Sequence, residues 1–447
     1  MAARVKGGSG SVDRRWRRQA DRRRRATRAA RALTWLAVLA LGLAAVVIQG
    51  CDRGPKRPDR VIFVGIDAAD WSALDPLLAQ GRLPNFARLI AGGATGRLAT
   101  LYPLQKSPVI WTSIATGVYP EKHGIGGFLA PATRGDSVPY TGNVRRVKAV
   151  WNILGDVGLR VAVVGWMVTW PAETVNGYMV SDYIQYETER GIKLERQTYP
   201  EDLFEEVDAL RLSAADVPDQ AISDLYPLDA PADALAGAEW IKDYIKMVYA
   251  VDETFRRIAL ALSEKDVRFL AVYFNGIDSL CHSCWCFREN QGHPLQGVID
   301  DYYVWIDKTL GDFIKLADDR TLLVVASDHG FRGPWHTPDG ALLLGVDMHG
   351  PYGVVGLMGP GVERGARIPD ADVLDLAPTI LYALGLPVAR DMDGDVMTDA
   401  FRRGFLESNP AEFVATYETG EPKAGQPVAS PVDDQVRRKL KALGYIQ

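Results

Sequence analysis

Two apolar segments of the chain each end in side chains that can bind a divalent metal ion. The run VIFVGI, residues 61–66, is followed by Asp67. The run TLLVVAS, residues 321–327, is followed by Asp328 and His329. Short apolar runs of this kind predict buried strands, and adjacent ionisable groups at the end of a buried strand need partners. Because carboxylates mixed with imidazoles suit Zn²⁺ or Mn²⁺, we expect these residues to be among the ligands of a metal centre.

A third apolar run leads into a second set of candidate ligands. Residues 267–277 precede Asp278, and His282 follows Asp278 by four residues. If a helical turn follows the strand, this spacing places both side chains on one face. His349 stands shortly before another apolar run, residues 352–361. Six ligands divide into two sites of three, and two ions about 3.5–4 Å apart can hold the attacking and leaving oxygens of a displacement at phosphorus.

The elements that must position these ligands alternate between strand and helix, which predicts an α/β fold. We expect a largely parallel central sheet with helices on both faces and a ligand site beyond the carboxyl ends of its strands. The candidate ligands lie at those ends. The expected strands cover residues 61–66, 160–166, 267–278, 321–329 and 352–361, and the expected helices cover residues 72–92, 109–117, 234–263, 373–385 and 433–444.

Changes in composition divide the chain into a catalytic domain and flanking segments. The catalytic domain is expected over residues 59–404. Within it, residues 172–232 are less periodic and rich in Asp, Tyr and Pro, so we expect an inserted cap over about residues 172–265. Residues 405–447 are rich in Pro, Gly and Glu before a short amphipathic helix, and we expect them to form a C-terminal tail.

Seven motifs, in this order, resemble the alkaline phosphatase superfamily. The resemblance is strongest to its predicted phosphohydrolase/phosphomutase branch, which is related to the type I phosphodiesterases and nucleotide pyrophosphatases. The motifs span nearly all of residues 60–400, and their shared order makes the resemblance specific. They are GIDAADW (65–71), KSPVIWTSIATGVYPEKHGI (106–125), TWPAETVNGYMVS (169–181), NGIDSLCHSCW (275–285), ASDHGF (326–331), HGPYGVVGLMGPGV (349–362) and DLAPTILYALGLP (375–387).

The resemblance implies two divalent ions, Zn²⁺ or Mn²⁺, each bound by three side chains. For the last ligand, His336 is an alternative because it begins a similar phrase, but the apolar strand follows His349 at the expected distance. The implied ligands are Asp67, Asp328 and His329 for one ion, and Asp278, His282 and His349 for the other.

The resemblance also implies that Ser107 is the nucleophile. Ser107 would attack phosphorus and form a phosphoseryl intermediate that water then hydrolyses. A cation beside the hydroxyl lowers its pKa, so no separate general base is required. Lys106 is close enough in sequence to contact the phosphoryl group. The residues alone also fit a plain helix start, because Ser before a proline such as Pro108 is common there.

Departures from related families narrow the expected chemistry. Nucleotide pyrophosphatases have Thr as nucleophile and Asn three residues later, whereas this chain has Ser107 and Ile110, which weakens a nucleotide assignment. The sulfatase motif C/S-x-P-x-R is missing around Ser107. We therefore expect a hydrolase that cleaves a phosphomonoester or phosphodiester. An envelope phosphotransferase or phosphomutase with the same site is the alternative, and a non-catalytic metal-binding protein is a third hypothesis that the complete ligand set disfavours.

The N-terminal residues predict a membrane anchor. Residues 1–32 carry 12 Arg and Lys against two Asp and precede an uncharged apolar run, residues 33–50. An 18-residue helix just spans the hydrocarbon core, and basic flanks stay in the cytoplasm. Residues 51–58 are an expected linker, and cleavage before Cys51 with lipidation of that residue is the alternative to a transmembrane helix. In both cases the catalytic domain would be periplasmic or extracellular.

Charge and cysteine content exclude other classes. The net charge is −5 despite the basic N-terminus, so the rest of the chain is acidic and unsuited to a nucleic-acid groove. Four cysteines do not form a secreted disulfide framework. Cys281, Cys284 and Cys286 lie close together, and we expect a local disulfide or buried thiols in preference to a separate zinc site. The sequence indicates neither the oligomeric state nor the natural substrate.

Overall fold

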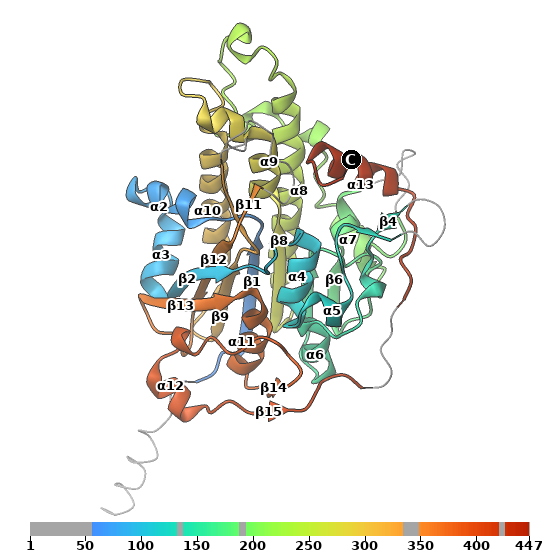
Figure 1. Ribbon diagram of the computed structural model, residues 1–447, viewed down its shortest axis with the longest axis vertical. Coiled ribbons are helices and arrows are strands. Elements are labelled where there is room, and N and C mark those ends of the chain that lie inside the picture. The colour runs from blue at the N-terminus through green and yellow to red at the C-terminus, as the bar shows by residue number, and fades with distance from the viewer. Residues whose placement is uncertain (1–55, 132–136, 187–193, 334–347, 420–424, 447) are drawn as a thin grey trace, which may run out of the picture. The chain divides into compact units, whose positions relative to one another are not determined.

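The centre of the computed structural model is a nine-stranded sheet with the order β13-β2-β12-β9-β1-β8-β5-β6-β7 (Figure 1). The structure describes residues 56–131, 137–186, 194–333, 348–419 and 425–446. The strands are β1 (Arg60–Ile66), β2 (Ala94–Ala99), β5 (Val161–Val164), β6 (Gly177–Val180), β7 (Thr198–Tyr199), β8 (Phe269–Phe274), β9 (Thr321–Ala326), β12 (Tyr352–Met358) and β13 (Ala366–Asp372).

Parallel pairing in the middle of the sheet aligns the strand ends that carry the expected ligands. β9, β1, β8, β5 and β6 are mutually parallel, while β12 runs antiparallel between β9 and β2. Ile66 pairs with Phe274, and Gly65 pairs with Ala326. Because these strands end together, the residues that follow them meet at one edge, as the apolar runs predicted.

Helices cover both faces, so the predicted α/β architecture is confirmed. Alternate side chains of β1 point into two separate cores, with Ile62 and Val64 on one face and Val61 and Phe63 on the other. The first core includes α2 (Trp71–Ala79), α3 (Pro84–Gly92), α8 (Trp240–Ser263), α9 (Gly276–Glu289) and α10 (Val298–Leu316), and the second includes α4 (Ser107–Thr116), α6 (Val150–Asp156) and α11 (Leu376–Ala383).

The segment expected as a cap, residues 172–265, contains parts of the core. β6 and β7 belong to the central sheet, and α8 packs against β8 and β5. Between β7 and α8 lie α7 (Leu203–Asp208) and short 3₁₀ turns, so the part outside the sheet is narrower, residues 200–239. β6 lay inside the expected cap because a strand of four residues is too short to show a period.

The C-terminal residues expected as a tail are folded against the domain. The two-residue strand β15 (Phe413–Val414) pairs with β14 (Val388–Ala389), and α12 (Arg403–Ser408) precedes it. α13 (Asp433–Ala442) matches the predicted final helix, lies above the carboxyl edge of the sheet in Figure 1 and contacts β4 (Val138–Pro139).

Two further expectations concern the ends and the cysteines. The predicted membrane segment, residues 33–50, and Cys51 lie outside the described residues, and none of the described helices is long and apolar enough to cross a bilayer. Cys281, Cys284 and Cys286 are all free thiols, the first two buried and the last exposed. The buried-thiol alternative therefore holds for Cys281 and Cys284, and the local disulfide is not formed.

Candidate active site

The first group of ligands, which we call the first triad, comprises Asp67, Asp328 and His329. Each offers a ligand atom, and these atoms lie within 4.8 Å of one another. The Nε2 atom of His329 is 3.3 Å from Oδ1 of Asp67 and 3.4 Å from Oδ2 of Asp328. All three side chains are fully buried. The structure therefore brings together the three residues that sequence analysis grouped.

Two aromatic side chains orient Asp67. Trp111 of α4 donates its indole N–H to Oδ2 of Asp67 at 3.3 Å, and the Tyr273 hydroxyl at the end of β8 donates to the same oxygen. Oδ1 is thereby left facing His329. Gly65 makes the arrangement possible, because a Cβ there would lie 2.7 Å from the Trp111 ring. Such contacts to the far oxygen of a ligand fix its orientation.

Backbone geometry orients the rest of the first triad. Ala68 adopts a left-handed conformation with φ 61°, and its N–H points at Oδ1 of Asp328 at 3.4 Å. A non-glycine residue in this region stores strain, which is common at functional sites. Nδ1 of His329 lies 2.9 Å from the Gly330 carbonyl, so it can donate there and leave Nε2 directed at the carboxylates.

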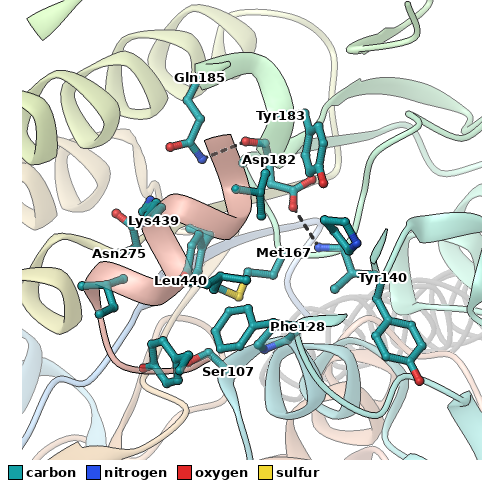
Figure 2. A pocket seen from close by; sticks show the side chains of 18 of the residues that line it. Ser107, Phe128, Tyr140, Met167, Asp182, Tyr183, Gln185, Asn275, Lys439 and Leu440 are labelled. Atoms are coloured by element: carbon teal, nitrogen blue, oxygen red, sulfur yellow. Dashed lines mark hydrogen bonds between the residues drawn. The ribbon is translucent and has the colours of Figure 1, made fainter. Parts of the chain in front are cut away.

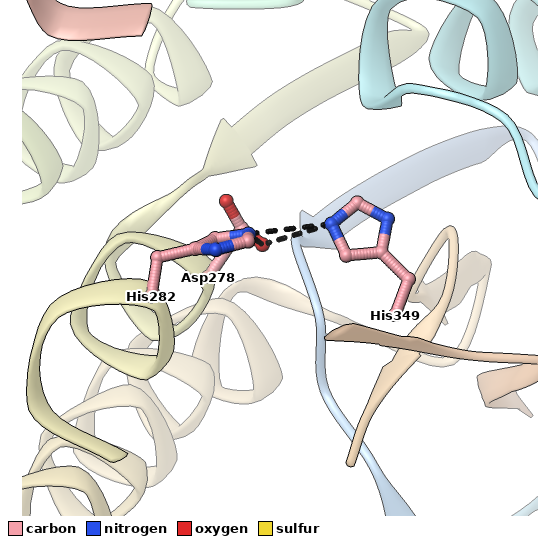
Figure 3. Close-up of side chains that lie close together, drawn as sticks. All are labelled: Asp278, His282 and His349. Atoms are coloured by element: carbon pink, nitrogen blue, oxygen red, sulfur yellow. Dashed lines mark hydrogen bonds and ion pairs between the residues drawn. The ribbon is translucent and has the colours of Figure 1, made fainter. Parts of the chain in front are cut away.

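The second triad comprises Asp278, His282 and His349, shown in Figure 3. Asp278 and His282 lie one turn apart on α9, as their spacing predicted. Nε2 of His282 is 3.3 Å from Oδ1 of Asp278 and 3.3 Å from Nε2 of His349. His336, the alternative to His349, lies outside the described residues.

The start of α9 is held by a buried carboxylate that sequence analysis did not single out. Asp252 of α8 accepts hydrogen bonds from the N–H groups of Asn275 and Gly276 and from the Tyr302 hydroxyl. Burial raises the pKa of Asp252 to about 7, although these hydrogen bonds oppose the shift. This contact fixes the turn from β8 into α9 and thereby the position of Asp278.

A two-stranded ladder joins the triads. β10 (Gly330–Phe331) follows His329 directly and pairs with β11 (His349–Gly350). The rings of His329 and His349 stack with centroids 3.6 Å apart and an interplanar angle of 14°. One ligand of each triad is thus in contact with the other, which is the proximity that a two-ion centre requires.

Ser107 lies beside this junction. It is the first residue of α4, with Pro108 in the first turn, so it is both the predicted helix start and a side chain of the site. Its Oγ is 3.4 Å from Nε2 of His329, and the side chain is buried. Lys106 occupies the N-cap position of α4, and its Cδ passes near Gly127. Contact between Lys106 and a phosphoryl group stays a prediction.

The two triads differ in electrostatics. Burial alone would lower the pKa of His329, but the charges of Asp328 and Asp67 outweigh it and raise this pKa to about 10. Burial, and then the charge of Asp67, raise the pKa of Asp328 well above its usual range. In the second triad, burial and the neighbouring imidazoles His329 and His282 lower the pKa of His349 well below its usual value. His349 is therefore neutral, the form that binds metals.

The residues fit divalent cations. Among the described residues, three buried carboxylate oxygens of the triads have no hydrogen-bond partner, namely Oδ1 of Asp67, Oδ1 of Asp278 and Oδ2 of Asp328. Buried carboxylates without donors are costly unless a cation compensates them. Each of these oxygens faces an imidazole Nε2 of its own triad. Oxygen and nitrogen donors in groups of three suit Zn²⁺ or Mn²⁺.

A cavity of about 100 Å³ opens beside Ser107 and Asp278 (Figure 2). Its wall is mostly apolar, with Phe128, Met167 and Phe255 among the lining side chains. Sequence analysis did not predict that C-terminal residues line the cavity. The residues that do so are Val436, Lys439, Leu440, Leu443 and Tyr445. An amphipathic pattern at 433–444 was the one signal that this helix packs against the domain, and it did not indicate where.

Paired triads at the carboxyl edge of an α/β sheet, with a buried serine beside the cavity, form a candidate site for metal-dependent phosphoryl transfer. Residues 61–333 match the family of type I phosphodiesterase / nucleotide pyrophosphatase. The chain belongs to that family and is a metal-dependent phosphoric ester hydrolase, and its fold is that of an alkaline phosphatase. His349 and the C-terminal wall lie beyond the matched residues.

The solved structures that are similar to this chain have low sequence identity to it. Alkaline phosphatase PafA is 14% identical with a TM-score of 0.51, and the alignment covers 78% of this chain and 99% of that one. Human ectonucleotide pyrophosphatase / phosphodiesterase 5 is 13% identical with a TM-score of 0.45, covering 77% and 100%. Phosphonoacetate hydrolase from Sinorhizobium meliloti 1021 is 20% identical with a TM-score of 0.40. The alignment covers 66% of this chain and 61% of that one. No curated protein sequence matches the chain.

Proposed function

We propose that the chain hydrolyses a phosphomonoester or phosphodiester through a phosphoseryl intermediate at Ser107, with two divalent ions, Zn²⁺ or Mn²⁺, on the two triads. The observation that carries the proposal is the position of Ser107. Its Oγ lies 3.4 Å from the first triad, and the same residue lines the cavity together with Asp278 of the second triad. This position, beside the first triad and in the wall of the cavity, supports Ser107 as the nucleophile.

Each residue has a defined part in this reaction. Ser107 Oγ forms a bond to phosphorus while the bond from phosphorus to the leaving alcohol breaks, and the alcohol departs with a proton. Water then cleaves the Ser107 phosphoester and releases phosphate or a monoester. Bound ions supply the charge that lowers the hydroxyl pKa and neutralises the phosphoryl oxygens. Trp111 and Tyr273 keep Asp67 in position throughout.

The experiment compares p-nitrophenyl phosphate with bis-p-nitrophenyl phosphate, using the full chain purified in detergent. Each substrate is assayed with Zn²⁺, Mn²⁺ or EDTA, beside the Ser107→Ala variant. Release that requires both an ion and Ser107 supports the proposal, and the ratio of rates separates monoesterase from diesterase. Release that persists in Ser107→Ala contradicts the nucleophile assignment.

A phosphotransferase or phosphomutase would use the same side chains and differ in the acceptor. Adding an acceptor alcohol and analysing the products separates these reactions. Free phosphate or monoester as the sole product supports hydrolysis. A phosphorylated acceptor in excess over free phosphate overturns it in favour of transfer.

We further propose that the chain is held at a membrane by residues 33–50, with the catalytic domain periplasmic or extracellular. Support comes from the basic residues 1–32 directly before the uncharged apolar run. Protease added to intact spheroplasts should digest the catalytic domain if it faces outward. Protection of the domain until the membrane is permeabilised would contradict this orientation.

A further inference from the structure

The C-terminal segment, defined here as residues 430–446, packs over the entrance of the active site. Leu440, Leu443 and Tyr445 form a small apolar cluster against Phe128 and Leu129. Farther back, Val432 joins the cluster of Trp170 and Tyr183. The guanidinium of Arg437 donates to the Ser137 carbonyl at 2.7 Å. These contacts place α13 on the domain and direct the last turn of the segment at the second triad.

Tyr445 reaches the second triad itself. Its hydroxyl lies 2.8 Å from Nε2 of His282 and 2.9 Å from Nε2 of His349. It also points at Oδ2 of Asp278 at 3.4 Å, and it is in hydrogen-bonding contact with Ser107. One hydroxyl from the C-terminal segment thus contacts all three ligands of one ion and the nucleophile.

The contacts of Tyr445 use the same atoms that an ion requires. An imidazole Nε2 has a single in-plane position, which is either a lone pair that accepts a hydrogen bond or an N–H that donates one. A metal ion on Nε2 needs that lone pair free and the nitrogen unprotonated. The hydrogen bonds between Tyr445 and the two imidazoles, His282 and His349, therefore cannot coexist with an ion bound by those two nitrogens, whichever group donates.

We propose that Tyr445 is an exchangeable cap on the second triad, which leaves His282 and His349 when a divalent ion binds there. The C-terminal segment thereby becomes an active-site element whose contacts depend on ion occupancy. The inference rests on the proposed pair of ion sites and adds a residue beyond the matched family region. Because linkage is reciprocal, loosening the segment strengthens ion binding and ion binding loosens the segment. After exchange, Asp278 Oδ2 and Ser107 remain within reach as partners for the hydroxyl.

The Tyr445→Phe variant tests the exchange, because it removes the hydroxyl and keeps the ring. That ring packs 4.6 Å from Phe128 and 5.0 Å from His282, so the fold of the segment should persist. Zn²⁺ or Mn²⁺ is titrated calorimetrically into the full chain after chelation. Breaking a net hydrogen bond opposes ion binding, so the variant should bind the second ion about two- to tenfold more tightly. Unchanged or weaker binding overturns the proposal, and weaker binding would make Tyr445 a ligand.

The matched control is Tyr183→Phe. Tyr183 lines the same cavity, and its hydroxyl has no hydrogen-bond partner among the described residues. Removal of that hydroxyl should leave the affinity of both ions unchanged. A shift in ion affinity equal to that of Tyr445→Phe would show a general effect of the cavity and would overturn the specific role of Tyr445.

Hydrogen exchange supplies a readout that does not depend on activity. Amide exchange in a peptide covering residues 440–446 should accelerate about threefold or more when the second ion binds, and it should already be fast in Tyr445→Phe. Ion-independent exchange overturns the cap. If the chain hydrolyses no ester but exchange and affinity respond as expected, the proposed function fails and the cap stands. Ion-dependent hydrolysis with no effect of Tyr445→Phe on affinity or exchange refutes the cap alone.

Discussion

The two triads hold the same number of ligands on different supports. Asp67, Asp328 and His329 follow the central strands β1 and β9, whose register fixes them directly. The second triad depends on α9 for Asp278 and His282, and on the two-residue strand β11 for His349. The residues of the first triad therefore directly follow strands of the central sheet, whereas those of the second triad lie on α9 and on β11, which are outside that sheet.

The triads also differ in what competes with an ion. The first triad holds two carboxylates around His329, which raise the pKa of that imidazole to about 10 against the effect of burial, so a proton is the competitor. In the second triad, burial keeps His349 neutral, and the competitor is the hydroxyl of Tyr445. The comparison indicates that ion binding responds to pH at one triad and to the C-terminal segment at the other.

The largest effect is expected from removing Ser107, the proposed nucleophile that serves both triads. Ser107→Ala should lower kcat by at least about 10³-fold, because the residue that receives the phosphoryl group is lost. Both triads keep all their ligands, so two ions per chain should still be found by elemental analysis. Near-normal turnover would show that another group attacks phosphorus.

The next largest effect is expected from removing one ligand of either triad, which should change the number of ions bound per chain. Asp328→Ala should lose the ion of the first triad and retain that of the second, and His349→Ala should do the reverse. Both variants should lose most activity, since displacement at phosphorus uses both ions. Elemental analysis after dialysis measures the ions. Loss of both ions from either variant would mean that the stacked rings of His329 and His349 couple the triads into one site.

A smaller effect is expected from the support of Asp67. Tyr273→Phe removes the hydroxyl that donates to Oδ2 of Asp67. Loss of such an outer contact weakens metal binding by about 10–100-fold, and the weakening should be confined to the first triad. The second ion is the internal control in the same titration. Equal weakening of both ions would contradict the independence of the two supports.

The smallest effect concerns protons. Below pH 10 the first triad carries the proton of His329, so ion binding to Nε2 should release about one proton, and this release should vanish as pH rises through about 10. His349 has a lowered pKa, so ion binding to its Nε2 should release close to no proton. Calorimetry of Asp278→Ala and Asp328→Ala, each in buffers of different ionisation enthalpy, measures the two triads separately. Equal release would refute the electrostatic contrast.

The sequence predicted the strands that are recognisable from their own residues. β1, β8 and β9 are continuous apolar runs because both faces of each strand are buried, and the ligands stand directly after them. β2 and β13, toward one edge of the sheet, were not predicted. Their exposed positions, such as Arg97 and Asp370, interrupt the apolar pattern.

The missed residues of the site act across long sequence separations. Tyr445 contacts His282 and His349 across 163 and 96 residues, and its surroundings in sequence contain no metal-binding spacing. Trp111 and Tyr273 look like ordinary core aromatics until the fold brings them to Asp67. Only the three-dimensional arrangement assigns these contacts.

The hydrogen bond between Trp111 and Asp67 has an optical consequence. The indole N–H contacts a ligand of the first triad, and the ring lies 5.0 Å from both Trp166 and Tyr273. Indole emission depends on the charge beside the ring, so a change in the charge of Asp67 alters the light that Trp111 emits. Trp111, one of the 11 tryptophans of the chain, is therefore the side chain through which filling of the first triad is expected to change the emission.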